Sequence, residues 1–325
     1  MRISQTWAAV GAILAAASCH VACAAPDFPS HPVTIVVPYA PGGPTDTAGR
    51  ILATGLQEET GGNFIVENAP GAGATLGSGK VARAKPDGYT ILWGGTSTHA
   101  IAPHLRSNLP YDPFKSFESV AMVGSQPYLV MVRADSPFKT IADLIKAGKA
   151  KPGSLNYSSP GTGSAPHLAT ELFLHETGIS ARHIPYKGGA PAMMAVLSGD
   201  VDFYLDTPTL PKAQAAVGKA RLLATSNPVR LKDLPDVPTL KESGYDKLDM
   251  KTWFGLFVPA GTPKNVVDWL NQKVNAVLHK PAVVKQLVAA GFKVEPMSVQ
   301  VFDAYVHSEY TRWGKIIKDA NVSIQ

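Results

Sequence analysis

The sequence has almost no cysteine and little charge. Its 2 cysteines, Cys19 and Cys23, lie near the start of a chain of 325 residues. The remainder can therefore form no disulfide and use no thiol in catalysis. Charged residues make up 17%, below the ~25% usual for globular proteins, whereas hydrophobic residues make up 45%. This composition excludes an intrinsically disordered chain, and the length predicts two domains.

Runs of basic residues are also missing, although Lys and Arg (30) outnumber Asp and Glu (25). Nucleic-acid-binding proteins usually gather their basic residues on one face or in runs. The scattered charge therefore argues against a nucleic-acid partner. The small positive excess is compatible with an anionic small molecule.

The one long apolar run stands at the start of the chain. Arg2 is followed by the apolar stretch Trp7–Ala17 and by small residues ending at Ala25. This pattern predicts a secretory signal peptide over residues 1–25. The stretch is shorter than the ~20 residues of a membrane span. A buried helix and a lipoprotein acylated at Cys19 or Cys23 are the alternatives, and neither cysteine has Leu three positions before it.

Short β-branched runs alternate with amphipathic stretches in the rest of the chain. Helices are expected over 46–60, 165–177, 263–279 and about 299–321, the third with Thr262 as its N-cap. Strands are expected over 34–39, 64–68, 90–94, 120–124, 128–133, 155–158, 183–186, 201–205, 221–225, 253–258 and 292–295. This alternation predicts an α/β fold with mostly parallel sheets.

No internal repeat or long flexible linker marks a domain boundary. Two segments suit strands that cross between domains: 120–133, which holds two strand runs in tandem, and 253–258, which returns toward the C-terminal helices. We therefore expect a discontinuous first lobe of residues 26–126 and 254–325. Residues 127–253 would form the second lobe.

Glycine-rich loops connect several expected strands to helices. The clearest are 39–46 (Tyr-Ala-Pro-Gly-Gly-Pro-Thr-Asp) and 158–164 (Ser-Ser-Pro-Gly-Thr-Gly-Ser), and 94–99 and 185–191 are similar. Ligands of open parallel sheets bind at this edge, and a helix N-terminus favours an anion. The alternative is a set of plain turns, with Asp46 or Thr45 and Ser164 as helix N-caps.

Other motifs give no catalytic or metal site. The glycines of 71–77 depart from the dinucleotide fingerprint at Leu76 and lack its acidic residue about 20 positions on, so a turn before a packed helix is expected. His167, Glu171 and His175 share one broad helix face, for which a solvated or capping role is favoured over a metal site. Neither Gly-x-Ser-x-Gly nor His-Glu-x-x-His occurs.

A set of motifs in fixed order nevertheless identifies a family. They are Pro-Tyr-Ala-Pro-Gly-Gly-Pro-Thr-Asp at 38–46, Val-Glu-Asn-Ala-Pro-Gly-Ala-Gly at 66–73, Pro-Asp-Gly-Tyr-Thr-Ile-Leu at 86–92, Leu-Pro-Tyr-Asp-Pro at 109–113, Asn-Tyr-Ser-Ser-Pro-Gly-Thr-Gly-Ser at 156–164, His-Leu-Ala-Thr-Glu at 167–171, Pro-Tyr-Lys-Gly at 185–188, Leu-Pro-Asp-Val-Pro-Thr at 234–239 and Pro-Ala-Gly-Thr-Pro at 259–263. Over essentially the whole mature chain, the sequence resembles the Bug family of extracytoplasmic solute receptors of tripartite tricarboxylate transporters.

The resemblance implies a periplasmic binding protein of a Gram-negative bacterium, with a two-lobed, type II Venus-flytrap fold and hinge strands. It implies no catalysis, cofactor or metal. The ligand would be a small carboxylate: an amino acid, a di- or tricarboxylate, or an aromatic acid. The partners would be the membrane subunits of the transporter or a sensor kinase, and the protein a monomer. An exported enzyme acting on a small carboxylate is the alternative.

The resemblance also supports a set of ligand-binding residues between the lobes. Those within the two main loops agree with the loop analysis, Thr96, Ser97, Tyr186 and Gly188 lie in the two similar loops, and Asp206 comes from the resemblance alone. The sequence departs from the family at Pro44, where Gly or Ser is commoner, and at Thr207, where Asn often follows the acid. The full set is Tyr39, Pro41, Gly42, Gly43, Thr45, Asp46, Thr96, Ser97, Ser158, Gly161, Gly163, Ser164, Tyr186, Gly188 and Asp206.

Overall fold

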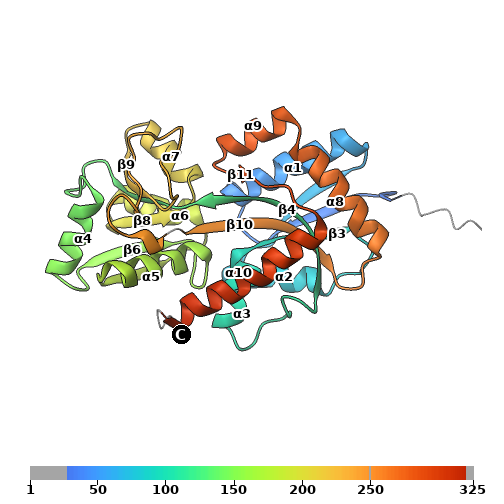
Figure 1. The fold of residues 1–325 in the computed structure, drawn as a ribbon, viewed down its shortest axis with the longest axis horizontal. Coiled ribbons are helices and arrows are strands. Elements are labelled where there is room, and N and C mark those ends of the chain that lie inside the picture. The colour runs from blue at the N-terminus through green and yellow to red at the C-terminus, as the bar shows by residue number, and fades with distance from the viewer. Residues whose placement is uncertain (1–27, 249, 320–325) are drawn as a thin grey trace, which may run out of the picture.

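Two α/β lobes lie side by side and are joined by long strands (Figure 1). The computed structural model describes residues 28–248 and 250–319. The signal peptide expected over residues 1–25 lies outside the described residues. In the part of the chain that is described, no helix is long and apolar enough to cross a membrane.

The first lobe is built on a six-stranded sheet with the order β11-β4-β10-β3-β1-β2. β1 pairs in parallel with β2 and β3, whereas β10 runs antiparallel to β3 and β4. Its strands are β1 (Val33–Val37), β2 (Phe64–Asn68), β3 (Thr90–Gly95), β4 (Phe117–Pro127), β10 (Lys251–Pro259) and β11 (Lys293–Val294).

The second lobe has a five-stranded sheet with the order β7-β6-β8-β5-β9. β6 is parallel to β7 and β8, and β5 is antiparallel to β8 and β9. Its strands are β5 (Leu129–Arg133), β6 (Leu155–Ser159), β7 (Ala181–Pro185), β8 (Phe203–Asp206) and β9 (Ala220–Thr225).

The expectation of mostly parallel sheets is therefore wrong, because both sheets are mixed. The chain passes from β4 directly into β5 and returns through β10, which enters the first sheet against the direction of its neighbours. A strand that crosses between lobes has no crossover helix to reverse the chain, so it pairs antiparallel. The predicted lobe boundaries fall at the end of β4 and within β10, and they stay a prediction.

The helices cover both sheets. Those expected at 46–60 and 165–177 correspond to α1 and α5, and the C-terminal helix is described as far as Asp319. The α-helices are α1 (Pro44–Thr60), α2 (Thr75–Ala82), α3 (Ala102–Leu105), α4 (Ile141–Ala150), α5 (Ala165–Thr177), α6 (Gly189–Ser198), α7 (Thr209–Ala216), α8 (Lys264–Leu278), α9 (Pro281–Ala289) and α10 (Val299–Asp319). Shorter turns are η1 (Ala72–Ala74), the π-helical η2 (Thr96–Ile101) and η3 (Asp246–Leu248).

Two predicted helix caps are wrong. α8 has Pro263 as its N-cap, and the Thr262 hydroxyl instead donates to the Pro259 carbonyl at 2.7 Å. α1 has Gly43 as its N-cap, so neither Thr45 nor Asp46 caps it. In both cases Pro occupies or adjoins the first helical position and fixes the backbone for entry into the helix without a side-chain cap.

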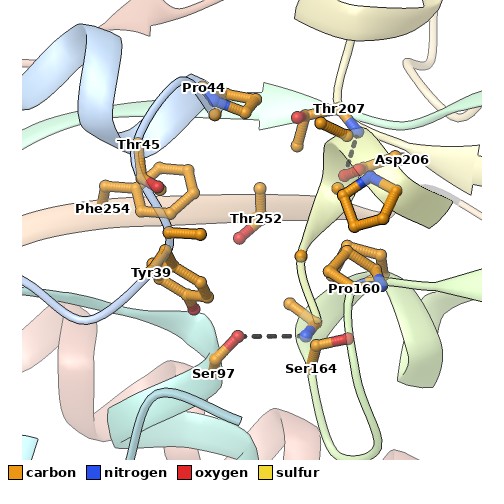
Figure 2. A pocket seen from close by; sticks show the side chains of 18 of the residues that line it. Tyr39, Pro44, Thr45, Ser97, Pro160, Ser164, Asp206, Thr207, Thr252 and Phe254 are labelled. Carbon is orange, nitrogen blue, oxygen red and sulfur yellow. Dashed lines mark hydrogen bonds between the residues drawn. The ribbon is translucent and has the colours of Figure 1, made fainter. Parts of the chain in front are cut away.

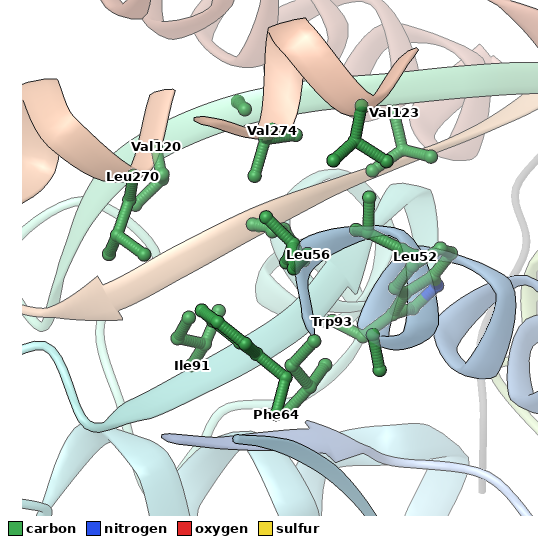
Figure 3. Packing of buried hydrophobic residues seen from close by; sticks show 14 of the residues in the cluster. Leu52, Leu56, Phe64, Ile91, Trp93, Val120, Val123, Leu270 and Val274 are labelled. Atoms are coloured by element: carbon green, nitrogen blue, oxygen red, sulfur yellow. The ribbon is translucent and has the colours of Figure 1, made fainter. Parts of the chain in front are cut away.

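The core of the first lobe lies between its sheet and helices α1 and α8 (Figure 3). Each of its fully buried Val and Leu side chains stabilises the fold by about 1.5–3 kcal/mol. The labelled residues are Leu52 and Leu56 of α1, Leu270 and Val274 of α8, and Phe64, Ile91, Trp93, Val120 and Val123 of the strands.

A second apolar cluster joins the two lobes. Ala165 and Leu168 of α5 pack in one cluster with Trp253 of β10 and with Phe302 and Trp313 of α10. In Figure 1, α10 runs from the first lobe toward the second below the crossing strands. The lobes therefore meet through buried side chains as well as through the strands.

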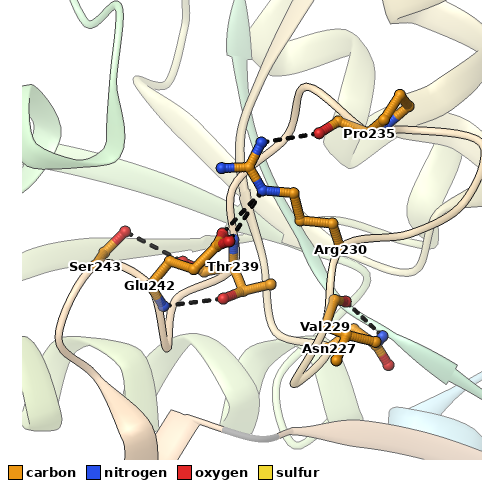
Figure 4. Close-up of polar contacts among 7 residues, drawn as sticks. All are labelled: Asn227, Val229, Arg230, Pro235, Thr239, Glu242 and Ser243. Carbon is orange, nitrogen blue, oxygen red and sulfur yellow. Dashed lines mark hydrogen bonds and ion pairs between the residues drawn. The ribbon is translucent and has the colours of Figure 1, made fainter.

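The segment between β9 and β10 has little regular structure but is tied by polar contacts (Figure 4). Arg230 Nε donates to both carboxylate oxygens of Glu242 at 3.0 and 3.1 Å, and its Nη1 donates to the Pro235 carbonyl at 2.9 Å. Thr239 and Glu242 exchange side-chain and backbone bonds, as in a capping box. The motif at 234–239 thus takes part in the bonds that fix the segment leading into β10.

Candidate functional site

A cavity of about 110 Å³ lies between the lobes (Figure 2). We call it the inner cavity. The first lobe contributes the β1–α1 loop, Ser97 and the β10 residues Thr252 and Phe254, and the second lobe faces them. The lining residues are Tyr39, Ala40, Pro41, Gly43, Pro44, Thr45, Ser97, Pro160, Ser164, Ala165, Pro166, Gly188, Gly189, Ala190, Pro191, Asp206, Thr207, Thr252 and Phe254.

The N-terminus of α1 opens into this cavity from the first lobe. Gly43 is the N-cap and Pro44 the first helical residue, and the first backbone bond of the helix runs from Thr47 N–H to the Gly43 carbonyl. The N–H groups of Thr45 and Asp46 have no acceptor within the described residues. They carry the positive end of the dipole of a 17-residue helix, which favours an anion.

Asp46 does not compete with an anion at this helix start. Its carboxylate accepts hydrogen bonds from Gly42 N–H at 2.9 Å, Arg50 Nε at 3.1 Å and Asn68 Nδ2 at 3.0 Å. Burial raises the pKa of Asp46, but the bonds from Arg50, Gly42 and Asn68 outweigh burial and hold the pKa below its usual value. Arg50 thus neutralises the negative charge of Asp46. The same carboxylate holds the glycine loop through its bond from Gly42 N–H.

A second helix N-terminus, that of α6, reaches the cavity from the second lobe. Gly188 precedes the helix with φ of 122°, a conformation that side chains rarely adopt. The N–H groups of Gly189 and Ala190 have no acceptor within the described residues, and Pro191 has none to offer. Two helix starts from opposite lobes therefore present unpartnered amides to one cavity.

The N-terminus of α5 is different, because its amides are already paired. The Ser164 hydroxyl caps the helix by accepting from His167 N–H at 3.4 Å, as the sequence predicted. Ala165 N–H donates to Ser97 Oγ of the other lobe at 3.0 Å, and Pro166 has no N–H. This helix start closes the cavity and joins the lobes, but it offers no free amide.

Asp206 gives the inner cavity an acidic wall. It is buried at the end of β8, where its Oδ1 accepts from Thr207 N–H at 2.7 Å and its Oδ2 accepts from the Tyr204 hydroxyl. Burial raises the pKa of Asp206 to about 6, against the lowering effect of these two bonds. Across the cavity, burial raises the pKa of Tyr39 to about 12, and its hydroxyl lies toward Ser97.

A larger cavity of about 500 Å³ adjoins the inner one and shares Tyr39, Ala40, Pro160, Ser164 and Gly188 with it. We call it the outer cavity. Its charged lining residues within the described chain are Arg106 and Lys187. The inner cavity, by contrast, has Asp206 as its charged residue. The space between the lobes is therefore acidic at one end and basic at the other.

The structure brings most predicted ligand-binding residues to these cavities. Gly161 and Tyr186 line the outer one. Those that line the inner cavity are Tyr39, Pro41, Gly43, Thr45, Ser97, Ser164, Gly188 and Asp206.

Five predicted residues line neither cavity and act behind the loops. Gly42 binds Asp46, as described above. Thr96 Oγ1 accepts from Trp253 N–H at 2.9 Å, Ser158 Oγ donates to the Ala192 carbonyl at 2.8 Å, and Gly163 N–H donates to His167 Nδ1 at 3.2 Å. Their role in ligand binding stays a prediction.

Several lining residues were missing from the predicted set. Thr252 and Phe254 lie on β10, whose crossing position was expected but not its passage beneath the cavity. Thr207 and Pro44 stand at positions where the sequence departs from the family, and they were not in the predicted set. The remaining ones are mostly Pro and Ala flanking the predicted glycines: Ala40, Pro160, Ala165, Pro166, Gly189, Ala190 and Pro191.

The structure also explains two other motifs, the glycines of 71–77 and the helix face that carries His167. The glycines of 71–77 form η1 and the start of α2, as a turn before a helix, and Gly71 and Gly73 line the outer cavity. Of the two roles expected for His167, the solvated one is wrong, since the residue is 5% exposed, whereas its bond from Gly163 N–H, next to the N-cap Ser164, agrees with a capping role. Among residues 28–248 and 250–319, no group of His, Cys, Asp and Glu could hold a metal ion.

Known proteins are similar to this chain in both sequence and fold. Residues 48–322 match the family described as "Tripartite tricarboxylate transporter family receptor". The periplasmic binding protein BugD is 36% identical with a TM-score of 0.87, over 92% of this chain and 100% of that chain. Rpa4515 of R. palustris, solved with adipate, is 33% identical with a TM-score of 0.88, over 91% and 99%. MatC of Rhodopseudomonas palustris, with bound malate, is 32% identical with a TM-score of 0.84, over 89% and 100%.

Proposed function

The chain belongs to the receptor family of tripartite tricarboxylate transporters, a family of periplasmic solute-binding proteins without enzymatic activity, and from that premise we propose that it captures a small organic acid in the inner cavity. The match to this family and the likeness to BugD confirm the family and the two-lobed periplasmic-binding-protein fold predicted from the sequence. What remains to be proposed is the ligand and how these residues bind it.

The observation that carries the proposal is the pair of helix N-termini. The free N–H group of Thr45, which lines the inner cavity, and that of Asp46 next to it belong to one lobe, and those of Gly189 and Ala190 belong to the other. A carboxylate between them accepts from both lobes at once. Each hydrogen bond to a charged group stabilises the complex by about 1.5–3 kcal/mol, and each helix dipole adds up to ~2 kcal/mol when the site is partly buried. No cationic side chain is needed for this.

The remaining lining specifies the body of the ligand. Five prolines and Phe254 give the inner cavity an apolar and rigid wall, which suits a hydrocarbon skeleton. Asp206 accepts from a hydroxyl, an ammonium or a protonated carboxyl, and it repels a second carboxylate placed beside it. The carboxylate of the ligand therefore stays between the two helix starts, as far from Asp206 as their amides allow, and a hydrogen-bond donor of the ligand faces Asp206.

A second carboxylate fits the outer cavity. Arg106 and Lys187 are its charged lining residues in the described chain, and it adjoins the inner cavity at Tyr39, Ala40 and Gly188, which line both. A dicarboxylate is thereby favoured over a monocarboxylate. Rpa4515 and MatC, solved with adipate and malate, support this ligand class by similarity.

We further propose that the leader directs this chain to the periplasm, where it acts as a monomer and delivers its ligand to the membrane subunits of a transporter. A sensor kinase is a second possible recipient of the closed form. Both follow from the family and the leader pattern rather than from the cavities.

Thermal unfolding with a panel of acids tests the proposed ligand class. Adipate, malate, an amino dicarboxylate and an aromatic acid are each compared with the corresponding amide, which has the same shape without the charge. A ligand at a hundredfold excess over its Kd stabilises the fold by ~2.7 kcal/mol, so at least one acid should raise the Tm. Equal Tm values for every acid and its amide would contradict the proposal, and conversion of the acid into a product would favour an exported enzyme.

A further inference from the structure

A buried polar cluster lies directly behind the loop Pro160–Ser164. We call it the histidine cluster, and it consists of Tyr157, Ser159, His167, Glu171 and His183. The rings of His167 and His183 stack with centroids 4.0 Å apart and an angle of 19°, and Tyr157 stacks on His183 at 4.9 Å. None of the three rings lines either cavity. The proposed function therefore gives this cluster no role.

The cluster holds two amides of the loop. Gly163 N–H donates to Nδ1 of His167 at 3.2 Å. Gly161 N–H donates to Ser159 Oγ at 3.2 Å, and the same hydroxyl lies 2.6 Å from Nε2 of His183. Gly161 and Gly163 have φ of 140° and 80°, so this part of the loop has a backbone that most residues would not adopt. His167 Nδ1 and Ser159 Oγ thus accept from two amides of the loop and help to fix its course, together with the bonds from Gly188 N–H to the Pro160 carbonyl and from Arg106 to the Thr162 carbonyl.

These contacts define the protonation state of His167. An imidazole nitrogen accepts a hydrogen bond only when it carries no proton, so Nδ1 is bare and the proton is on Nε2. Nε2 points toward Glu171, whose Oε1 is 3.8 Å away and accepts from the Tyr157 hydroxyl. The titratable groups against His167 are thus Glu171, Tyr157 and His183. Burial lowers the pKa of His167 to about 3, with a further lowering by His183, and burial lowers the pKa of His183 to about 4.

We propose that His167 is a positioning residue for ligand binding, whose unprotonated Nδ1 holds Gly163 and keeps the loop Pro160–Ser164 against the ligand. This inference rests on the proposed function, because the loop matters only if the cavity binds a ligand. His183 supports it by stacking on the ring and by bonding Ser159. Neither histidine touches the ligand.

Protonation of His167 releases the loop. A proton on Nδ1 turns the acceptor into a donor that faces the N–H of Gly163, and the two donors cannot bond. The bound form excludes this proton, while a released loop exposes the ring and allows its pKa to rise toward the usual ~6.5. Affinity is therefore full above pH 6.5 and falls as the pH decreases toward 4.

Two substitutions of His167 test the hydrogen-bond acceptor and the stacked ring separately. In His167→Asn the side-chain oxygen takes the place of Nδ1, so an acceptor remains without titration. In His167→Phe the stacking remains without an acceptor. With adipate and malate as probes, we expect the Phe variant to bind about tenfold more weakly than the Asn variant, because a buried N–H is left unpaired. His175→Asn, on the exposed part of the same helix, is the control and should bind as the wild type does.

The pH profile supplies a readout that a purely structural role would not change. It is measured in an Asp206→Asn background, so that Asp206 does not titrate. The carboxyl groups of the acid titrate equally in both proteins, so the ratio of the affinity with His167 present to the affinity with His167→Asn should fall as the pH is lowered from 7 to 5. Equal affinities of the Asn and Phe variants, or parallel pH profiles, would overturn the positioning role and leave the proposed function intact.

Amide hydrogen exchange of Gly163 tests the same inference without a ligand. The amide should exchange about tenfold faster in His167→Phe than in His167→Asn, provided that both variants unfold at similar temperatures. Equal exchange rates would overturn the inference even if neither adipate nor malate binds. Failure of every acid to bind, with unequal exchange rates, would instead count against the proposed function alone.

Discussion

At the scale of the residue, the two carboxyl groups near the cleft behave in opposite ways. Asp46 is surrounded by donors and has the Arg50 guanidinium beside it, so its charge is neutralised. Asp206 is buried with neutral donors, and within the described residues it has no cationic partner. Burial of an unpaired charge is costly, and Asp206 therefore stores a penalty that a ligand donor can relieve.

We expect Asp206→Asn to stabilise the ligand-free protein at high pH. The folded protein holds the proton of Asp206 up to a pKa of about 6, whereas the unfolded chain releases it near 3.8. The contribution of Asp206 to the free energy of unfolding is therefore fully present below pH 4 and is lost as the pH rises through 6. For the isolated group the loss is on the order of 3 kcal/mol. Removing the charge should raise the free energy of unfolding by about 1 kcal/mol or more at pH 8 and by little at pH 4.

Urea unfolding at both pH values measures this effect. Asp236→Asn, at an exposed position, serves as the control and should change little at either pH. A stabilisation of Asp206→Asn that is the same at pH 4 and pH 8 would show that folding does not raise the pKa of Asp206.

The residues of the site show what a single sequence can and cannot reveal. Gly43, Ser97 and Ser164 could be placed because strand-to-helix loops gather at one sheet edge and carry family motifs. The positions of Thr252 and Phe254 could not, because they depend on β10 passing beneath the cavity, which no local pattern encodes. The burial of His167 could not be predicted for a similar reason, since Tyr157 of β6 and His183 of β7 stack against its ring.

At the scale of the element, the proposed anion site consists of two helix starts rather than of side chains. α1 and α6 both begin without a side-chain cap, so their first amides are free to bind a ligand. α5 has a serine cap and a bond to Ser97, and it serves the contact between lobes instead. The presence or absence of a cap thus separates a binding helix from a structural one.

We predict that Gly43→Val weakens ligand binding at least tenfold while the fold persists. Gly43 has an extended backbone with φ of −85° and ψ of 173°, and an added Cβ would lie 3.8 Å from the Ala40 carbonyl, which is an ordinary contact. The larger side chain should obstruct the approach of a carboxylate to the α1 amides. Calorimetry with the best ligand of the panel measures the change.

Gly43→Ala is the matched control for this variant. Ala and Val are equally poor N-caps, so both variants lose the same cap preference of about 1 kcal/mol or less in stability. The difference in affinity between them reports the volume of the side chain alone. Equal affinities of the Ala and Val variants would place the anion away from α1.

The elements themselves were easier to predict than their pairing. Gly61 and Gly178, which end α1 and α5 in the left-handed region, stand out in the sequence as helix stops. Strand directions were not predictable in this way, because an antiparallel β10 has the same β-branched pattern as a parallel strand. The mixed sheets follow from the path of the chain between lobes.

At the scale of the whole molecule, the lobes are held together on both sides of the cavities. Ser97 Oγ accepts from Ala165 N–H, and Arg106 Nη2 donates to the Thr162 carbonyl at 3.4 Å. Both bonds join the first lobe to the loop or helix that faces it. They can form only when the lobes are close, so they stabilise the closed form.

We expect Ser97→Ala to shift the molecule toward an open form. The Ala165 amide would lose its partner only in the closed state, at a cost of about 1–3 kcal/mol if it stays dry. The radius of gyration from small-angle scattering with a saturating acid should then exceed that of the wild type, and affinity should fall about five- to tenfold. Ser308→Ala, on the exposed side of α10, is the control.

If the wild type has the same radius of gyration with and without the acid, the lobes do not move as hinged bodies. A loss of affinity with unchanged compactness would indicate instead that Ser97 contacts the ligand directly.

The place of β10 in the first sheet has a consequence for the order in which the molecule is made. β10 lies between β3 and β4, but the chain reaches it only after completing all strands of the second lobe. The N-terminus emerges first when the chain is made. The second lobe can therefore fold while β3 and β4 still expose unpaired edges. Such edges can pair with other chains, so we expect the first lobe to be more prone to aggregation than the second until residue 259 has appeared.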